Sequence, residues 1–246
     1  MEPDEYRRMF DAEAMHWWFQ GKRAIVERLI ARFAEARPAG RVLDVGCGTG
    51  ATLQMLAGYG DAHGVDVEPL ALRLCRRRGL HRLAAASAEH LPFRAEQFDV
   101  ITVLDVLYHR RIDHMAAALR EARRVCRPGG LLVVTDCAYA WLRSRHDAAV
   151  HGARRFRRAD LEAAIAESGF EVLMASYMNT ILFPLAAAAR LVDRARHGTS
   201  TPQSSLGSEQ PRANRVLAGI YRLEARLLGR VRFPFGLSVV VVGRRP

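Results

Sequence analysis

The chain is almost without lysine. Lys22 is the only one among 37 basic residues, and the rest are arginines. Together with the abundant alanine, this bias is typical of a GC-rich bacterial genome. The net charge is +11, but the arginines are spread along the chain and form no compact basic cluster, the usual footprint of nucleic-acid binding. Nucleic acid is therefore disfavoured as a partner, and we interpret the arginines mainly as a solvated surface.

The sequence also lacks paired cysteines and long apolar runs. Cys47, Cys75, Cys126 and Cys137 include no Cys-x-x-Cys pair, which disfavours a metal site or a disulfide framework and fits a reducing compartment. No apolar run approaches the roughly 18 residues of a membrane span. The first ten residues are charged and lack the apolar centre of a signal peptide. We expect a cytoplasmic protein, with peripheral contact at the inner face of the membrane as the alternative.

Short apolar runs alternate with segments of helical spacing, the pattern of right-handed crossovers and a parallel sheet covered on both faces. A final run follows a Pro-Phe-Gly turn and is expected to complete the sheet. The predicted strands are 41–45, 62–67, 81–86, 98–105, 130–136, 170–177 and 237–245, and the predicted helices between them are 50–58, 69–78, 113–126 and 158–168.

Two segments lie outside this alternation. Residues 1–38 look helical and precede the first strand, and residues 180–230 separate the last two strands. We therefore predict an N-terminal helical lid (1–38), a core formed by 39–179 and 231–246, and a helical and loop insertion (180–230) that caps the substrate.

The insertion itself has two parts. Residues 180–192 are apolar nearly all round, as expected of a buried helix in a substrate cap. An interfacial helix resting on acidic lipid through 180–196 is the alternative. The following polar stretch, HGTSTPQSSLGSEQPRAN, has the composition of a mobile loop.

The stretch RVLDVGCGTGA, residues 41–51, contains the first predicted strand and the turn that follows it. This turn fits the pattern of either of two nucleotide-binding sites. Gly46, Gly48 and Ala51 fit the G-x-G-x-x-A fingerprint of a dinucleotide fold, whereas Asp44 with Gly46, Gly48 and Gly50 fits D-x-G-x-G-x-G. In either site the glycines let the backbone approach the ligand closely. The carboxylate of Asp44 would repel a pyrophosphate at a helix N-terminus, but it suits the ammonium and sulfonium of S-adenosylmethionine. The turn predicts S-adenosylmethionine rather than NAD.

The sequence resembles the class I S-adenosylmethionine-dependent methyltransferases, in particular the small-molecule group called type 11, over roughly residues 40–136. Five motifs occur in the family's order: LDVGCGTG, GVDVEP, SAEHLPF, FDVITVLDVLYH and REARRVCRPGGLLVV. The resemblance implies a Rossmann-like α/β sheet, mostly parallel with an antiparallel last strand and helices on both faces. It also implies S-adenosyl-L-methionine as cofactor and S-adenosyl-L-homocysteine as product.

The resemblance assigns the cofactor contacts. Asp66 is expected to hold both ribose hydroxyls, and the backbone N–H of Ala88 to meet the adenine edge. Ser87 departs from the aspartate usual in the family and can accept the adenine hydrogen bond only without charge. Leu91, Val67 and Leu104 are candidates for the apolar walls, although core packing explains them equally well. The predicted cofactor-binding residues are Asp44, Gly46, Cys47, Gly48, Gly50, Asp66, Val67, Ser87, Ala88, Leu104, Trp17 and Arg23.

The lead-in stretch EAMHWWFQGKR places Trp17 beside Trp18. Two exposed tryptophans are costly unless they cover something. Related methyltransferases carry an aromatic N-terminal segment that closes over the cofactor, often with a downstream arginine on its carboxylate. Arg23 is the candidate for that arginine, since a guanidinium binds a carboxylate bidentately. Packing of the tryptophans onto the sheet is the alternative.

The stretch DVLYHRR after the fourth predicted strand faces the transferable methyl group in this family. Its catalytic candidates are Asp105, Tyr108 and His109. Methyl transfer depends mainly on orientation, but a hydroxyl acceptor also needs a base. The intrinsic pKa of His109 suits that role, and helix capping is its alternative.

The acceptor is less well specified. The D/N-P-P-Y/F motif of methyltransferases that act on nucleic-acid amines reads DVLY here. The stretches HWWF and FPFGLSVVVVGR resemble bacterial methyltransferases associated with surface polysaccharide or lipid-linked sugars. We predict a methyltransferase acting on a hydroxyl or amine of a sugar, a lipid-linked acceptor or a secondary metabolite. An RNA or protein methyltransferase and a catalytically inactive S-adenosylmethionine-binding module are the alternatives.

Overall fold

The computed structural model describes residues 1–34, 40–197 and 211–246. The strands are β1 (Gly40–Val45), β2 (Gly60–Asp66), β3 (Leu83–Ala85), β4 (Phe98–Leu104), β5 (Cys126–Cys137), β6 (Glu171–Met178) and β7 (Ser238–Arg244). The helices are α1 (Pro3–Ala12), α2 (Trp17–Phe33), α3 (Ala51–Leu56), α4 (Pro69–Arg77), α5 (Met115–Val125), α6 (Arg145–Ala149), α7 (Arg158–Glu167), α8 (Phe183–His197) and α9 (Pro211–Leu227), with a 3₁₀ turn, η1 (Ala140–Leu142).

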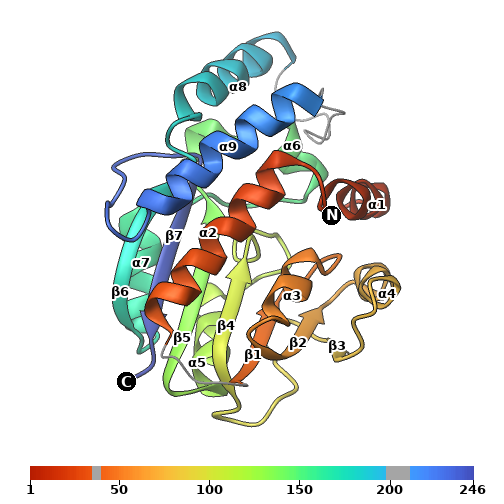
Figure 1. Cartoon of the computed structure of the whole chain (residues 1–246), viewed down its shortest axis with the longest axis vertical. Helices are drawn as coiled ribbons and strands as arrows, with labels where there is room; N and C mark the ends of the chain where they lie inside the picture. Colours follow the sequence, from red (N-terminus) through yellow and green to blue (C-terminus); the bar gives the residue numbers. More distant parts are fainter. Residues whose placement is uncertain (35–39, 198–210) are drawn as a thin grey trace.

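The strands form one sheet in the order β3-β2-β1-β4-β5-β7-β6 (Figure 1). Neighbouring strands pair in parallel from β3 to β5, and β7 runs antiparallel to both β5 and β6. This confirms the predicted Rossmann-like sheet with an antiparallel last strand. Because β1 lies beside β4, the chain reverses its direction of winding between them, and ligands of such folds bind outside the strand ends at that point.

The turn after β1 requires glycine. Gly46, Gly48 and Gly50 have φ of +72°, +54° and +92°, which only glycine adopts without strain. A Cβ on Gly46 would also lie 2.3 Å from a methyl carbon of Val106. At these glycines, the turn between β1 and α3 therefore exposes its backbone, with no side chains, at the carboxyl end of the sheet.

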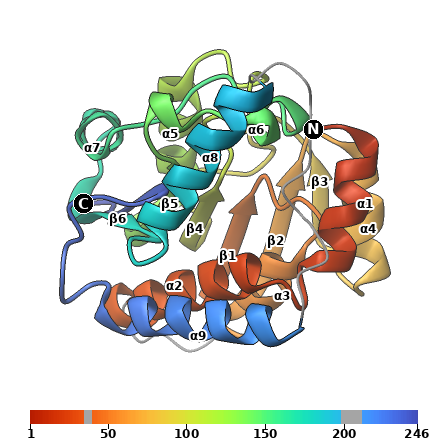
Figure 2. The ribbon, with the colours of Figure 1, turned by 90° about the horizontal axis from the view of Figure 1, so that it is seen from above.

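Two helices far apart in the sequence cover one face of the sheet. Figure 2 shows α2 and α9 side by side on this face, with α5 and α7 on the other. Apolar side chains of α2, such as Leu29, pack with Tyr221 of α9 and with the β-strands beneath. The predicted lid (1–38) therefore differs from the structure: only α1 and the first turns of α2 lie over the strand ends, and the rest of α2 belongs to the core. In the same way, α9 packs on the sheet, and none of its described residues is among those that line the cavity, so the substrate cap stays a prediction.

Two short helical elements that follow β5, η1 and α6, were not predicted. The predicted polar loop of the insertion lies largely outside the described residues. Among the helices that the structure describes, none is both long and apolar enough to cross a membrane.

The contact between α2 and α9 depends on Gly21. A Cβ there would lie 1.6 Å from a ring carbon of the buried Tyr221, whereas a Cβ on the exposed Gly219 of α9 would meet open space. We expect Gly21→Ala to lower the free energy of unfolding by about 1–3 kcal/mol, because it overpacks the core. Gly219→Ala should raise it by about 0.5–1 kcal/mol through helix propensity. Urea titration of both variants tests this, and equal unfolding midpoints would contradict the packing.

Candidate active site

A cavity of about 380 Å³ lies at the carboxyl ends of β1, β2, β4 and β5. Its floor is the glycine turn and the strand ends, and α1, the start of α2 and part of α8 cover it. The cavity brings together the following predicted residues: Asp44, Gly46, Cys47, Gly48, Asp66, Val67, Ser87, Ala88, Leu104, Trp17, Asp105, Tyr108 and His109.

Asp66 closes the cavity at the end of β2. Its carboxylate accepts hydrogen bonds from the backbone N–H of Gly48 at 3.0 Å and of Glu68 at 2.9 Å. Burial raises the pKa of Asp66, and these two hydrogen bonds oppose the shift. Each oxygen keeps a lone pair, since each accepts one of the two bonds. The carboxylate is thus fixed in place with capacity to accept from a ligand's hydroxyls.

Asp44 is the second buried acid of the cavity. It is the residue before the last in β1, with 2% of its surface exposed, and Thr102 Oγ1 donates to its Oδ1 at 2.6 Å. Burial raises the pKa of Asp44 to about 7, although the Thr102 hydrogen bond lowers it. A cation placed beside this carboxyl would favour its ionised form. The group therefore suits a positively charged ligand.

Two predicted cofactor residues do not line the cavity. Gly50 is the N-cap of α3, and its positive φ helps to form the turn without contributing to the cavity lining. Arg23 is turned toward the lead-in, where its guanidinium donates to the backbone oxygen of Glu13 at 2.7 Å. Leu91 also lies away from the cavity, buried in the core beside α5. In the structure Arg23 therefore makes a backbone hydrogen bond within the lead-in segment, and Leu91 packs in the core.

The end of α1 is tied to the glycine turn. Glu13, with 7% of its surface exposed, accepts a hydrogen bond from Thr49 Oγ1 and pairs with Arg78 at 3.0 Å. Arg78 also donates to the backbone oxygens of Thr49 and Phe10 at 2.8 Å each. Because these contacts cross from α1 to the turn and to α4, they hold the lead-in segment over the cavity.

The other end of the cavity is built on β4 and β5. Asp105 follows β4 with φ +55°, and its carboxylate pairs with Lys22 of α2. The Lys22 ammonium is almost fully buried and lies 5.2 Å from the ring centre of Trp18. This lysine, the only one in the chain, was not among the predicted site residues. Its ammonium places a positive charge where β4 meets the lead-in.

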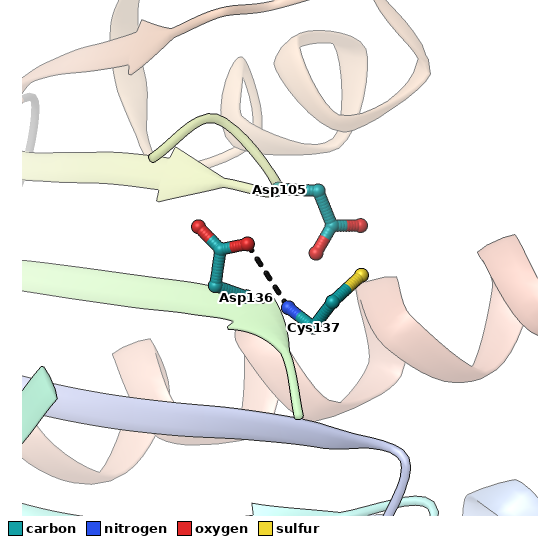
Figure 3. Close-up of side chains that lie close together, drawn as sticks. All are labelled: Asp105, Asp136 and Cys137. Carbon is teal, nitrogen blue, oxygen red and sulfur yellow. Dashed lines mark hydrogen bonds between the residues drawn. The ribbon is translucent and has the colours of Figure 1, made fainter. Parts of the chain in front are cut away.

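Asp136 and Cys137 of β5 lie next to Asp105 (Figure 3). One carboxylate oxygen of each aspartate and the Sγ of Cys137 all lie within 4.8 Å of one another. Asp136 is completely buried and accepts hydrogen bonds from the backbone N–H of Cys137 at 2.9 Å and of Tyr108 at 3.1 Å. Burial, followed by the charge of Asp105, raises the pKa of Asp136 well above its usual value. Burial also raises the pKa of the Cys137 thiol to about 12. Asp105 is the carboxylate of this group that contacts the Lys22 ammonium.

The surroundings of Tyr108 and His109 weaken both as bases. Burial raises the pKa of Tyr108 well above its usual value. Burial, and then the Met1 ammonium, lowers the pKa of His109 to about 4. Its Nδ1 accepts from the backbone N–H of Arg111 at 3.1 Å, and its Nε2 lies 3.3 Å from the Met1 amino group. The near-neutral pKa expected from the sequence does not hold, because the side chain is shielded from water and surrounded by positive charge.

Residues 43–134 match the family model described as a methyltransferase domain. These residues therefore carry a methyltransferase domain, and the chain is similar to S-adenosylmethionine-dependent methyltransferases. It is 29% identical over 248 residues to the malonyl-[acyl-carrier protein] O-methyltransferase of Geobacter sulfurreducens, with 91% of each chain covered. It is 36% identical over 117 residues to the ubiquinone/menaquinone biosynthesis C-methyltransferase UbiE of Cupriavidus pinatubonensis, covering 44% of this chain. The match spans only 47% of that relative's length.

A solved structure supports the same fold. A Thermotoga maritima protein described as a possible histamine N-methyltransferase superposes with a TM-score of 0.59 at 19% identity, covering 99% of this chain and 96% of its own. At this identity the likeness concerns the fold alone. The cofactor of this class of methyltransferase, S-adenosylmethionine, fits a cavity that presents two buried carboxyls, Asp44 and Asp66, beside a bare glycine backbone.

The polar residues that line this cavity and that the sequence analysis did not select include Lys22, Arg155, Arg190 and Ser238. Each comes from an element whose position depends on tertiary packing. For two of them a signal existed, because Lys22 is unique in the chain and Arg190 interrupts an apolar helix.

Asp66 offers a direct test of the cofactor end. We expect Asp66→Asn to weaken S-adenosylhomocysteine binding by about ten- to a hundred-fold, because a charged hydrogen-bond acceptor is lost. Asp61→Asn is the matched control, since Asp61 lies on the same strand and pairs with Arg82, outside the cavity. Calorimetry measures both affinities. Unchanged binding by Asp66→Asn would place the ribose elsewhere.

Proposed function

We propose that this methyltransferase transfers a methyl group from S-adenosylmethionine to a small-molecule acceptor held in the same cavity. The observation that carries the proposal is that one cavity runs from the glycine turn, past Asp105, to Arg190 and Ser238. Its first end is lined by the motifs of the methyltransferase domain. The second end lies over β5 and β7, and there we place the acceptor. When bound, S-adenosylmethionine supplies an electrophilic methyl group on its sulfonium.

The cover over the cavity supports a small acceptor or a small reacting group. Side chains of α1, α2 and α8 all line the cavity, among them Tyr6, Trp18 and Ala186. Such a cover also excludes water from the reacting centre. The names of the two relatives describe methylation of malonyl groups on an acyl carrier protein and C-methylation in quinone biosynthesis. For this chain we propose a hydroxyl or amine acceptor, as in sugars, lipid-linked compounds or secondary metabolites.

A membrane-surface contact through 180–196 stays a prediction. On α8, Leu185, Leu191 and Val192 are exposed, and Arg194 is exposed beside them. An apolar face flanked by arginines is compatible with anionic lipid. A lipid-linked acceptor would then reach the cavity from the side of α8.

We assign the proton-accepting role to Asp105. Its carboxylate lines the cavity next to the strand ends and is held by the Lys22 ammonium. One of its oxygens is buried and has no hydrogen-bond partner among the described residues, so it can accept from a ligand hydroxyl or amine. His109 is a weaker candidate, because its low pKa disfavours the protonated form that a base must reach. We assign His109 and Tyr108 to shaping the acceptor end.

This division of roles predicts different turnover for two variants. Asp105→Asn should lower turnover by about 10²–10⁴, the usual contribution of a general base. His109→Gln should lower it much less. Radiolabelled methyl transfer to a panel of sugars, phenols and carboxylic acids measures both. Binding of S-adenosylhomocysteine serves as the control for intact folding. If the histidine variant is the slower of the two, the assignment of Asp105 is wrong.

Asp44 predicts a proton linked to cofactor binding. Its carboxyl is about half protonated at pH 7, because its pKa is about 7. A nearby cationic ligand lowers the pKa, so binding at pH 7 should release about half a proton. Calorimetry in two buffers of different ionisation enthalpy measures this release. Asp44→Asn should abolish this proton release, while Asp61→Asn should leave it unchanged. Identical proton release by all three proteins would show that the cation lies away from Asp44.

A further inference from the structure

Arg190 stands in the wall of the cavity, and no carboxylate within residues 1–34, 40–197 and 211–246 forms an ion pair with it. It projects from α8, where Ala187, one turn earlier, packs with Leu142 and Leu237. In the part of the chain that the structure describes, its guanidinium makes one hydrogen bond, to the backbone oxygen of Leu142 at 3.5 Å. That distance is at the limit of a hydrogen bond. Most of the donors of this guanidinium are therefore unused.

The neighbouring charges do not neutralise Arg190. Asp147 of α6 binds Arg155 with both oxygens, at 2.8 and 2.9 Å, and also accepts from the backbone and hydroxyl of Ser144. Arg155 completes its contacts on the backbone oxygen of Ala138. Burial, followed by the charge of Arg155, lowers the pKa of Arg190. Asp147 attracts Arg190 as well but is already paired with Arg155, so among the described residues no carboxylate is left to pair directly with Arg190.

Ser238 provides an independent observation at the same end of the cavity. It begins β7 with 1% of its surface exposed, lines the cavity, and its hydroxyl has no hydrogen-bond partner within the described ranges. The residue before it, Leu237, packs with Leu142 and Ala187, the same two residues that flank Arg190. A buried hydroxyl without a partner is costly. Arg190 and the unpartnered Ser238 hydroxyl thus both lie close to the apolar contact between η1, α8 and β7.

This end of the cavity is distinct from the cofactor end. Ser238 pairs across the sheet with Cys137 of β5, and β5 is two strands from β1, with its glycine turn. Ser238 itself lies on β7, three strands from β1, and strands lie about 4.8 Å apart, so the two ends are separated by roughly 14 Å. We infer that Arg190 and Ser238 form a subsite for an anionic group of the acceptor, a carboxylate or a phosphate. The inference rests on the proposed function, in which this end holds the acceptor.

The chemistry of the two side chains fits an oxyanion. A guanidinium presents parallel N–H donors that bind two oxygens of a carboxylate or phosphate at once. The Ser238 hydroxyl can donate to a further lone pair. The anion would supply the missing counter-ion of Arg190 and a partner for the hydroxyl. Arg155, held by Asp147, keeps a second positive charge nearby without needing to contact the ligand.

Calorimetry with small probes tests the subsite. The protein, with and without saturating S-adenosylhomocysteine, is titrated with malonate, glycerol 3-phosphate and the uncharged malonamide. We expect at least one anion to bind more tightly than malonamide. Arg190→Gln should weaken that binding about tenfold or more, and Ser238→Ala by a smaller factor. Arg194→Gln is the matched control, because Arg194 is an exposed arginine one turn further along α8 and should leave anion binding unchanged.

The two anions distinguish a carboxylate from a phosphate as the preferred group. The inference is overturned if neither anion binds better than malonamide, or if Arg190→Gln binds both as the unmodified protein does. It is also overturned if Arg190→Gln weakens S-adenosylhomocysteine tenfold, because Arg190 would then serve the cofactor. Failure of the unmodified protein to bind S-adenosylhomocysteine would instead refute the proposed function, while the titrations without it still decide whether Arg190 holds an anion.

Discussion

The site depends on the close approach of Gly46 to Val106, which leaves no room for a side chain at the end of β1. Because the turn there is bare, the N–H of Gly48 can reach the Asp66 carboxylate at 3.0 Å and join the ends of β1 and β2. The same turn carries Thr49, whose hydroxyl contacts Glu13. One backbone constraint therefore fixes both the floor of the cavity and the attachment of the segment that covers it.

The cavity separates charge into two regions. Its cofactor end presents the acids Asp44 and Asp66, whereas its far end presents Arg190 beside the ion pair of Arg155 and Asp147. Between them, the ion pair of Lys22 and Asp105 lies at the end of β4. A ligand pair with positive charge at one end and negative charge at the other would match this gradient. A chain with net positive charge thus still offers an acidic environment where the fold needs one.

The alternation of apolar runs was sufficient to predict the sheet, and the motif around Asp44 and Asp66 was sufficient to predict the cofactor end. Local patterns have this power because a strand and its following turn are continuous in sequence. The sequence did not reveal the pairing of Lys22 with Asp105 or the contact of Gly21 with Tyr221, since each joins segments far apart in the chain. The low pKa of His109 could not be predicted from the sequence either, because burial and neighbouring charges determine it rather than residue type.

The uniqueness of Lys22 has a practical consequence. Any reagent selective for lysine side chains has one target in this chain, and that target lies inside the cavity, over Trp18 and against Asp105. A ¹³C-methyl label placed on its ammonium would give one side-chain resonance, free of overlap from other lysines. The chemical shift of that label would follow occupancy of the cavity from within, so the chain carries its own spectroscopic reporter.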